Sequence, residues 1–540
     1  MCLQFQYNRQ QPVGSIHDST HSFLAVVARR IHICHNRDNL DQPAEDTMRH
    51  TVLLYNPVST SKGKQRLPLS LLAVAAVIAA DYDVEFIDGN LMDDPAAQII
   101  ERARATQAKL LAVTVMPGPQ LRQAIPVCKQ VKAALPDLTI LWGGYFPTQH
   151  YEVILQDGSV DYVIQGQGEA PFRQFVDRIH HGGSLTDIPS LAYAEHGAVH
   201  VNPRAPNVPM DNLPLMPYDR LDVSRYVGNT YLGSRVLNHN TSFGCPFACN
   251  FCAVVALANR RWLPESAERV ANIVTHMQDK WHINGLEFHD MDFFVKEDRT
   301  AEFSERITGK GIQWWGLGRV DTLMSYSDDT WAKMQRSGAK MIFMGAESGD
   351  DETLKRMNKG GKSGTEVTLA LVERMKHYGI VPELSFVMGN PPDPRADIES
   401  TIQFIRKIKR INPATELVLY IYTPVPQEGS ILLDEATKLG FAFPKTLDEW
   451  ASPEWAKFSM RRDPGTPWFK DSVRTRVRNF ESVINAYYPT VTDMRLQGQW
   501  RKALQMLSGW RYRMEYYQWP YELKALQRVI HYRRPETTGF

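Results

Sequence analysis

The sequence predicts an α/β protein in three parts: a doubly wound, flavodoxin-like domain, a partial barrel of six βα units, and a helical C-terminal segment. Three observations support this. Short, continuously apolar strands alternate with helix-length segments from Met48 onward, the alternation starts again near residue 236, and the composition shifts to Trp, Tyr and Arg after residue 448. Strands without polar alternation are typical of a parallel sheet covered on both faces. A chain of 540 residues also exceeds one ordinary core.

The first series of strands and helices occupies residues 48–180 and predicts the doubly wound domain. Helix-length segments separate its five strand candidates, which are TVLLYN (51–56), DVEFID (83–88), LLAVTV (110–115), TILWGG (139–144) and YVIQG (162–166). In such a domain, ligands bind outside the carboxyl ends of the strands. Those ends are rich in Gly, Pro and small polar residues, which either make turns or leave room for a large flat ligand.

A second series predicts the partial barrel over residues 236–447. A Pro-rich segment, 181–235, precedes it and is expected to be an extended linker. The six strand candidates are VLNHNTSFG (236–244), GLEFHD (285–290), IQWWGLGR (312–319), MIFMGAE (341–347), ELSFVMG (383–389) and LVLYIYT (417–423). Six units rather than eight predict an incomplete barrel, with its active site at the carboxyl ends of the strands.

The two ends of the chain differ from these domains. Residues 448–540 are rich in Trp, Tyr and Arg and are expected to form a helical segment that packs on the barrel as a cap and could cover a substrate. Residues 1–47 are polar and poorly periodic, so we expect a disordered leader or a misassigned start.

Charge and cysteine usage restrict the partners. Lys plus Arg number 61 against 60 for Asp plus Glu, so no nucleic acid and no anionic membrane is implied. The longest apolar run, residues 69–80, is too short to cross a bilayer. Cys2, Cys34 and Cys128 are scattered, which argues against a disulfide framework and favours the cytoplasm.

The other three cysteines are concentrated in one short stretch. The segment TSFGCPFACNFCAV places Cys245, Cys249 and Cys252 directly after the first barrel strand. Structural zinc prefers four ligands, usually as two pairs, and no second pair follows here. Three thiolates suit a four-iron, four-sulfur cluster with one iron left open. The cluster is therefore the favoured interpretation, and zinc stays the alternative.

This Cys-x-x-x-Cys-x-aromatic-Cys motif, at the first strand of a partial barrel, resembles the radical S-adenosylmethionine superfamily. The resemblance implies that the three cysteines ligate the cluster and that S-adenosylmethionine chelates the open iron, to be cleaved to a 5′-deoxyadenosyl radical. It also implies an electron donor such as flavodoxin or ferredoxin. Segments that match the family's later strands imply further contacts to S-adenosylmethionine at Phe251, Asp290, Arg319, Glu347 and Gly389. Asp292 is an alternative to Asp290, because Met291 replaces the family's second acid. The structural alternative for Glu347 is an ion pair on the surface. The alternative for Asp290 and Arg319 is an ion pair with each other.

The first domain resembles the cobalamin-binding domain that precedes the barrel in one large subgroup. The similar segments include LTILWGGYFPT and DYVIQGQGEAPF. The loop NPVSTSKGKQRLP has no His, whereas a His in this loop ligates cobalt from below in the methionine-synthase type. Many members of the subgroup also lack this His. The strand ends implied to contact cobalamin are Thr114, Met116, Gly118, Gly143, Gly144 and Gly166.

The combination of two cofactors implies a radical methyltransferase. The adenosyl radical would take hydrogen from an unactivated carbon of a small-molecule, lipid or tetrapyrrole substrate, and methylcobalamin would supply the methyl group. Oxidative cyclisation or rearrangement, as in the anaerobic magnesium-protoporphyrin monomethyl ester cyclase, is the second hypothesis. A cobalamin or iron–sulfur sensor without turnover is the third.

Overall fold

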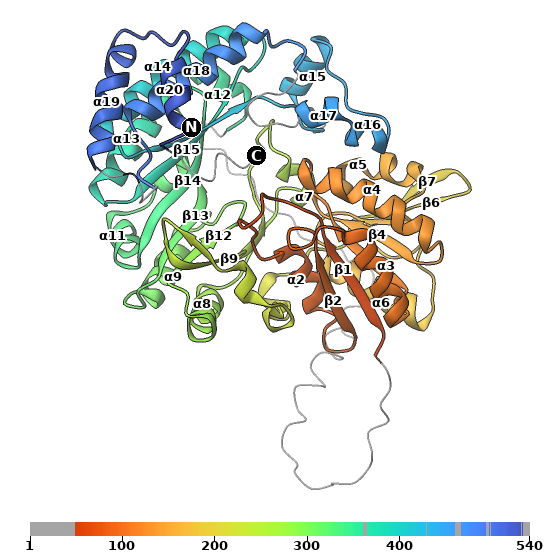
Figure 1. Ribbon diagram of the computed structural model, residues 1–540. Helices are drawn as coiled ribbons and strands as arrows, with labels where there is room; N and C mark the ends of the chain where they lie inside the picture. Colours follow the sequence, from red (N-terminus) through yellow and green to blue (C-terminus); the bar gives the residue numbers. More distant parts are fainter. Residues whose placement is uncertain are drawn as a thin grey trace, which may run out of the picture. The chain divides into compact units, whose positions relative to one another are not determined.

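The computed structural model describes residues 49–359, 364–427, 429–458, 466–492, 496, 498–530 and 532 (Figure 1). The predicted leader, residues 1–47, lies outside this part of the chain. Two seven-stranded sheets organise the described residues, and a two-stranded ribbon stands beside the second sheet.

The first sheet has the strand order β2-β1-β3-β4-β5-β6-β7. Its first five strands pair in parallel, which confirms the predicted doubly wound, flavodoxin-like domain. The strands are β1 (Thr51–Asn56), β2 (Asp83–Asp88), β3 (Leu110–Thr114), β4 (Thr139–Gly143), β5 (Tyr162–Ile164), β6 (Leu191–Glu195) and β7 (Ala198–Val201).

Helices cover both faces of this sheet, which explains why its strands are apolar without alternation. Leu53 and Tyr55 of β1 pack into one core with α3, α4 and α5, whereas Val52 and Leu54 pack into another with α2 and α6. The helices are α2 (Leu69–Ala76), α3 (Pro95–Thr106), α4 (Pro119–Ala134), α5 (Tyr145–Asp157) and α6 (Glu169–His181).

The segment expected to be an extended linker, residues 181–235, also adds strands to both sheets. β6 and β7 form an antiparallel hairpin at the edge of the first sheet, and β8 pairs antiparallel with β9 in the second. The residues between these strands form three short 3-10 helices: η1 (Met210–Asn212), η2 (Tyr218–Arg220) and η3 (Val223–Tyr226). The edge strand of a sheet has backbone N–H and C=O groups without partners, and these short strands form hydrogen bonds with those groups.

The second sheet has the order β16-β15-β14-β13-β12-β9-β8, and its six strands from β9 to β16 pair in parallel as predicted for a partial barrel. The strands are β8 (Gly228–Thr230), β9 (Gly233–His239), β12 (Gly285–Phe288), β13 (Gln313–Arg319), β14 (Ala339–Glu347), β15 (Val381–Met388) and β16 (Glu416–Ile421). β10 (Ser242–Gly244) and β11 (Trp262–Pro264) form the two-stranded ribbon.

The helices that cover the outer face of the second sheet and pack into the barrel core are α8 (Ala267–Trp281), α9 (Glu297–Ile307), α10 (Val320–Met324), α11 (Asp328–Arg336), α13 (Thr365–His377) and α14 (Pro394–Ile411). α7 (Val254–Ala258) lies between β10 and β11 in the chain, and α12 (Asp351–Arg356) and α15 (Ile431–Lys438) share a smaller core with Tyr422. α8 shows the local logic: Ser266 caps its first turn by accepting from the Arg269 amide, and Val270, Val274 and Met277 form its buried stripe.

The C-terminal segment is helical, as expected, and it contacts both domains. Leu447 and Trp450 of α16 are buried in a core of the first domain, and Phe480 and Ile484 of α18 are buried in the barrel core. Its helices are α16 (Leu447–Ala451), α17 (Pro453–Phe458), α18 (Asp471–Tyr487), α19 (Gly498–Arg513) and α20 (Tyr521–Gln527). Among the described residues, no helix is both long and apolar enough to span a membrane.

The loop after β1 joins the two domains. Arg66 forms a bidentate ion pair with Glu287 of β12, at 2.8 and 3.1 Å. The Leu67 amide donates to Asn238 Oδ1 of β9 at 2.9 Å. This loop contains no His, and its end is bound to the barrel strands.

Candidate functional site

The three clustered cysteines lie on one loop between β10 and α7. All three are free thiols, with Cys249 buried and Cys245 and Cys252 half-buried. The loop is bound to the segment after α12, because Asn250 donates from its amide to Met357 O at 2.9 Å and Asn358 Nδ2 donates to Ala248 O at 2.8 Å. The carboxyl-terminal side of β14 therefore helps to hold the shape of the cysteine loop.

A buried cation stands against this loop. Arg319, at the end of β13, donates from Nη1 to Cys249 Sγ at 3.2 Å, and its guanidinium carbon lies 3.8 Å from the centre of the Phe247 ring. Asp321 grips the same guanidinium at 3.0 and 2.9 Å. Arg319 thus pairs with Asp321 rather than with Asp290. A cation at this place stabilises negative charge on sulfur.

The thiols themselves are shielded from water. Burial raises the pKa of Cys245 to about 12 and raises the pKa of Cys252, so metal must displace protons from these groups when it binds. Three thiols on one loop, one of them accepting from a cation, fit an iron–sulfur cluster. Within the described ranges, no group of three or more His, Cys, Asp or Glu is placed to hold a single metal ion.

Glu347 forms a buried ion pair at the end of β14, not the surface pair that was the alternative. Its carboxylate is 2.5 Å from Lys359 Nζ, and the two side chains are 7% and 8% exposed. Glu347 has φ of +62°, a left-handed conformation that is uncommon outside glycine, at a register shift in the strand pairing. Lys359 also lies 5.7 Å from the centre of the Phe251 ring, which brings two predicted contacts to one place.

Gly345 leaves the space that this ion pair occupies. A Cβ at position 345 would lie 1.8 Å from Glu347 Oε1 and 2.5 Å from Lys359 Nζ. The Gly-x-Glu pattern of the fourth strand therefore has a steric reason in this chain.

The two candidate acids after β12 have different surroundings. Asp290 accepts from the Thr241 amide and hydroxyl and from the Ser242 hydroxyl, so it fastens the strand that leads into the cysteines. Asp292 accepts from the Phe294 amide, and its Oδ2 is buried with no hydrogen-bond partner among the described residues. Burial, with a contribution from Asp321, raises the pKa of Asp292 to about 7. An orphaned carboxylate oxygen fits a cationic ligand group, which favours Asp292 over Asp290 as the cofactor contact.

The surface of Gly389 is covered by an aromatic ring. Its φ is +84°, and a Cβ would lie 2.0 Å from Phe469 Cε2, an atom of the C-terminal segment. The close approach predicted at this glycine is made by Phe469 in this structure, so a cofactor contact at Gly389 stays a prediction.

The predicted cobalamin contacts gather at the carboxyl edge of the first sheet. Within the described part of the chain, a Cβ on Gly118 would meet no atom within 4 Å, and one on Gly143 would meet Ile164 O at 4.0 Å and nothing nearer. Met116 is exposed, and Thr114 is buried beside Ser70, whose hydroxyl is 2.9 Å from its own. Open space over two strand-end glycines fits a large flat ligand.

This edge meets the cysteine loop. Tyr145 follows Gly144 at the start of α5, and its pKa is raised by burial and next by the nearby Cys252. Gly166 lies on the same side, since its Cβ would be 3.3 Å from Leu257 O of α7 and 2.6 Å from Arg204 Nη1. The two predicted cofactor sites are therefore neighbours.

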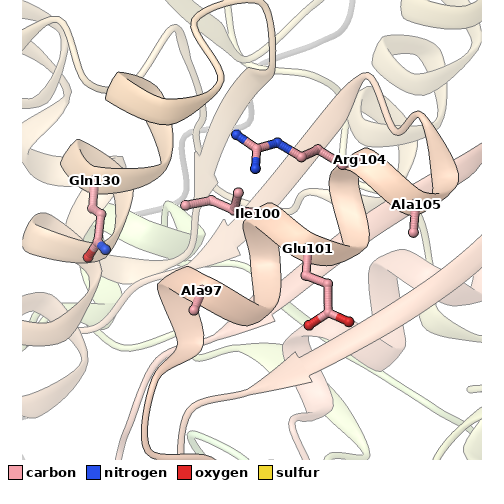
Figure 2. A pocket seen from close by; sticks show the side chains of 6 residues that line it. All are labelled: Ala97, Ile100, Glu101, Arg104, Ala105 and Gln130. Carbon is pink, nitrogen blue, oxygen red and sulfur yellow. The ribbon is translucent and has the colours of Figure 1, made fainter.

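A separate groove of about 650 Å³ lies on the helices of the first domain (Figure 2). Residues of α3 and Gln130 of α4 line it: Ala97, Ile100, Glu101, Arg104, Ala105 and Gln130. These residues lie along helices that cover one face of the sheet, so the groove contains none of the predicted cofactor contacts.

Sequence reasoning missed two members of the site. Lys359 follows Glu347 by 12 residues with no local pattern to connect them, and Tyr145 next to Gly144 resembled an ordinary core aromatic. Asp292 was recognised only as an alternative. The one signal that could have drawn attention to Lys359 is its position as a charged residue between α12 and α13.

Comparisons with known proteins agree with this geometry. Residues 58–176 match the model of the B12 binding domain, and residues 239–405 match that of the radical SAM superfamily. An uncharacterised methyltransferase of Pyrococcus horikoshii is 28% identical over 63% of this chain and 73% of the relative. The anaerobic magnesium-protoporphyrin IX monomethyl ester cyclase of a Synechocystis species is 24% identical over 58% of this chain and 64% of the cyclase.

The fold also has a solved counterpart. The radical S-adenosylmethionine methyltransferase TsrM of Kitasatospora setae, with cobalamin and a [4Fe–4S] cluster bound, superposes with a TM-score of 0.58 at 16% identity over 73% of this chain and 75% of that chain. The two matched segments follow one another along the chain: the first contains β2 to β5 of the first sheet, and the second contains β12 to β15 of the second sheet. This chain therefore belongs to the B12-binding radical SAM superfamily, as a cobalamin-dependent enzyme that uses a [4Fe–4S] cluster and S-adenosylmethionine.

Proposed function

We propose that the protein is a methyltransferase that adds a methyl group to an unactivated carbon of a small organic, lipid or tetrapyrrole substrate. The observation that carries this proposal is the proximity of the strand-end edge of the first sheet to the cysteine segment: a Cβ at Gly166 would lie 3.3 Å from Leu257 O of α7, and Cys252 is near enough to raise the pKa of Tyr145. When bound there, the cluster with S-adenosylmethionine supplies hydrogen-atom abstraction, and cobalamin supplies methyl transfer.

The residues around the cysteine loop bind and orient the first cofactor pair. Cys245, Cys249 and Cys252 would hold iron, and Arg319 would offset the negative charge on sulfur. Asp292 would accept a hydrogen bond from a cationic group of S-adenosylmethionine through its orphaned oxygen.

The Glu347–Lys359 pair serves the same cofactor. It is buried, preformed and held by a strained backbone at the strand end, so it costs little reorganisation when a zwitterionic ligand arrives. Phe251 lies beside Lys359 and offers an apolar ring to the adenosine part of the ligand.

The first domain would hold cobalamin without an imidazole from its β1–α2 loop. That loop has no His, and its Arg66 and Leu67 are engaged with Glu287 and Asn238 of the barrel. Gly118 and Gly143 leave the space for the ring system, and the adjoining Thr114, Gly144 and Gly166 complete the edge.

The inner face of the barrel sheet offers the substrate surface. On this face, alternate strand residues stay half-exposed, whereas their neighbours, such as Trp314 and Met344, pack against the outer helices. The half-exposed set is mostly apolar and would exclude water from a radical intermediate: Trp315, Leu317, Phe343, Val387 and Tyr420. His289 borders it, with Nε2 hydrogen-bonded to Glu287 at 3.1 Å and its ring 5.8 Å from that of Trp315.

Enzymes of this superfamily need a one-electron reductant, and we propose flavodoxin or ferredoxin as the donor. The methyltransferase proposal rests further on the names of the Pyrococcus relative and the Kitasatospora structure. The similarity to the Synechocystis cyclase makes oxidative cyclisation the second candidate function.

Product analysis separates these two reactions. The reconstituted, reduced protein is incubated with cobalamin, S-adenosylmethionine and an extract of candidate substrates. Methyl transfer predicts S-adenosylhomocysteine together with 5′-deoxyadenosine and label from the methyl group in the product. Formation of 5′-deoxyadenosine alone, with no methyl transfer, would overturn the methyltransferase proposal and favour cyclisation. The Cys249→Ala variant should lose iron and both products.

A further inference from the structure

The C-terminal helices carry a concentration of exposed apolar side chains. Nine of the fifteen large apolar side chains that are exposed in the described part of the chain fall within residues 500–529. Those that define what we name the C-terminal apolar surface are Trp500, Leu507, Trp510, Met514, Trp519 and Tyr521. Exposed apolar residues are usually scattered, and a group of them marks an interaction site.

The α19 helix has two apolar sides, and only one of them is buried against the rest of the described structure. Leu504 and Tyr512 are buried on the inner side, where the Tyr512 ring stacks on Tyr487 of α18 at 4.3 Å between centres. The outer stripe, Trp500 to Met514, repeats at intervals of seven, three and four residues, which places it on one helix face. The side chains of this second stripe stay 43–76% exposed in the described part of the chain.

The loop between α19 and α20 extends the surface with aromatic rings. Tyr516 stacks on Trp510 with 5.7 Å between ring centres. The buried Arg511 binds Trp519 O at 3.2 Å and lies 5.3 Å from the Tyr516 ring centre. These contacts order the backbone beneath the rings while Trp519 and Tyr521 stay 60% and 68% exposed.

The charges around this surface are predominantly positive. Residues 498–530 contain six Lys and Arg against two Glu, although the whole chain is nearly neutral. Both Glu side chains are paired with arginines, Glu515 with Arg406 and Glu522 with Arg511. Three exposed basic residues have no ion-pair partner among the described residues: Lys502, Arg513 and Arg528. The overall charge balance, which implied no anionic membrane partner, hides this local excess.

We propose that the C-terminal apolar surface binds the interface of an anionic lipid bilayer, with α19 lying in the plane of the headgroups. Trp and Tyr rings favour the boundary between headgroups and acyl chains, and neighbouring Lys and Arg attract anionic lipids. A second copy of the chain fits less well, because a two-fold contact would place the cationic surface against itself. This inference goes beyond the proposed function and does not require bound cofactors.

Flotation with lipid vesicles tests the proposal on the full-length protein. The probe is vesicles of equimolar phosphatidylcholine and phosphatidylglycerol, compared with phosphatidylcholine alone. The wild type should float with the anionic vesicles, and added salt should weaken the binding. Trp510→Ser should weaken it about tenfold, because one large apolar side chain is lost from the contact. Arg513→Glu should weaken binding to the anionic vesicles and leave binding to vesicles of phosphatidylcholine alone unchanged.

The matched control is Leu439→Ser, which removes an exposed apolar side chain after α15. It should float like the wild type, and the thermal unfolding of Trp510→Ser should be unchanged because that side chain is half-exposed. Binding that is absent, or that is insensitive to Trp510→Ser, would overturn the proposal. A dimer that Trp510→Ser dissociates, with no vesicle binding, would assign the surface to a second copy and overturn it too.

Discussion

Arg319 donates a hydrogen bond to the sulfur of Cys249, and this contact joins the end of β13 to the cysteine loop. The two residues are 70 positions apart, and both are buried. Hydrogen bonds and positive charge near cluster sulfurs raise the reduction potential of a cluster. The donor in this protein is a side chain that is itself fixed by Asp321 and by the Phe247 ring.

We predict that Arg319→Gln makes the reduction potential of the cluster more negative while the three cysteines keep their iron. The free energy of unfolding should also fall by about 3 kcal/mol, because Asp321 loses both hydrogen bonds to the guanidinium. Redox titration followed by electron paramagnetic resonance measures the potential. Arg374→Gln, which breaks an ion pair with Asp328 on α11, is the control and should leave the potential unchanged. An unaltered potential in Arg319→Gln would contradict the proposed role.

Substitutions at Asp290 and Asp292 should change the free energy of unfolding in opposite directions. The pKa of Asp292 is raised to about 7, so the folded apo-protein keeps a proton that the unfolded chain releases above about pH 4. Stability from this group is present at low pH and is lost as the pH rises through about 7. Asp292→Asn should therefore stabilise the apo-protein at pH 8 by roughly 1–3 kcal/mol, and hardly at all at pH 4.

Asp290→Asn should instead destabilise the protein by about 1–3 kcal/mol, because it weakens the bonds to Thr241 and Ser242. Denaturant unfolding at the two pH values measures both variants. Asp292→Asn should also weaken binding of S-adenosylmethionine. If both variants were destabilised equally, the assignment of the orphaned oxygen to a ligand would fail.

Gly345→Ala should displace the Glu347–Lys359 pair with little loss of stability. The new Cβ would meet the mobile ends of two side chains rather than backbone, so the side chains swing away and the strand stays in place. Affinity for S-adenosylmethionine, measured by calorimetry, should fall at least tenfold, and iron content should not change. Gly498→Ala, at a position with no atom within 4 Å, should match the wild type in both measurements.

Gly143→Leu should weaken cobalamin binding without disturbing the fold. The position lies outside the left-handed region, and its Cβ would enter open space at the strand-end edge. Gel filtration with cobalamin, followed by absorbance, should show binding weakened more than tenfold, because a side chain would fill the space for the ring. Gly498→Leu serves as the matched control. Retained cobalamin in Gly143→Leu would place the cofactor elsewhere.

The Arg66–Glu287 ion pair should couple the two domains. Burial alone would raise the pKa of Glu287, but His289 and Arg66 lower it to about 2, so this group stabilises the fold above about pH 4.5 and loses that effect as the pH falls toward 2. A double-mutant cycle of Arg66→Gln and Glu287→Gln should give a coupling free energy of about 1–3 kcal/mol at pH 7. A coupling near zero would mean that the loop is held by Leu67 and Asn238 alone.

Local sequence patterns determined the elements of both sheets. The bounds of β1 and β2 agree with the segments TVLLYN and DVEFID. Each is a short run of mostly apolar residues with polar residues at its ends, and this local pattern is enough to predict a strand. The three cysteines share one loop because they are neighbours in the chain. The hairpin β6–β7 was missed since its pairing partner, β5, is a separate strand and its own residues are partly polar.

The sequence by itself determined the order of the two domains and the class of each sheet, and it placed three cysteines on one short segment, all of which depend on neighbours within a few residues. Only the tertiary structure decided which carboxylate oxygen has no hydrogen-bond partner among the described residues, that Lys359 pairs with Glu347, and that Arg319 reaches Cys249. The physical reason is that a buried charge is defined by what surrounds it in space. Those surroundings come from chain segments dozens of residues away, and no local period or spacing records them.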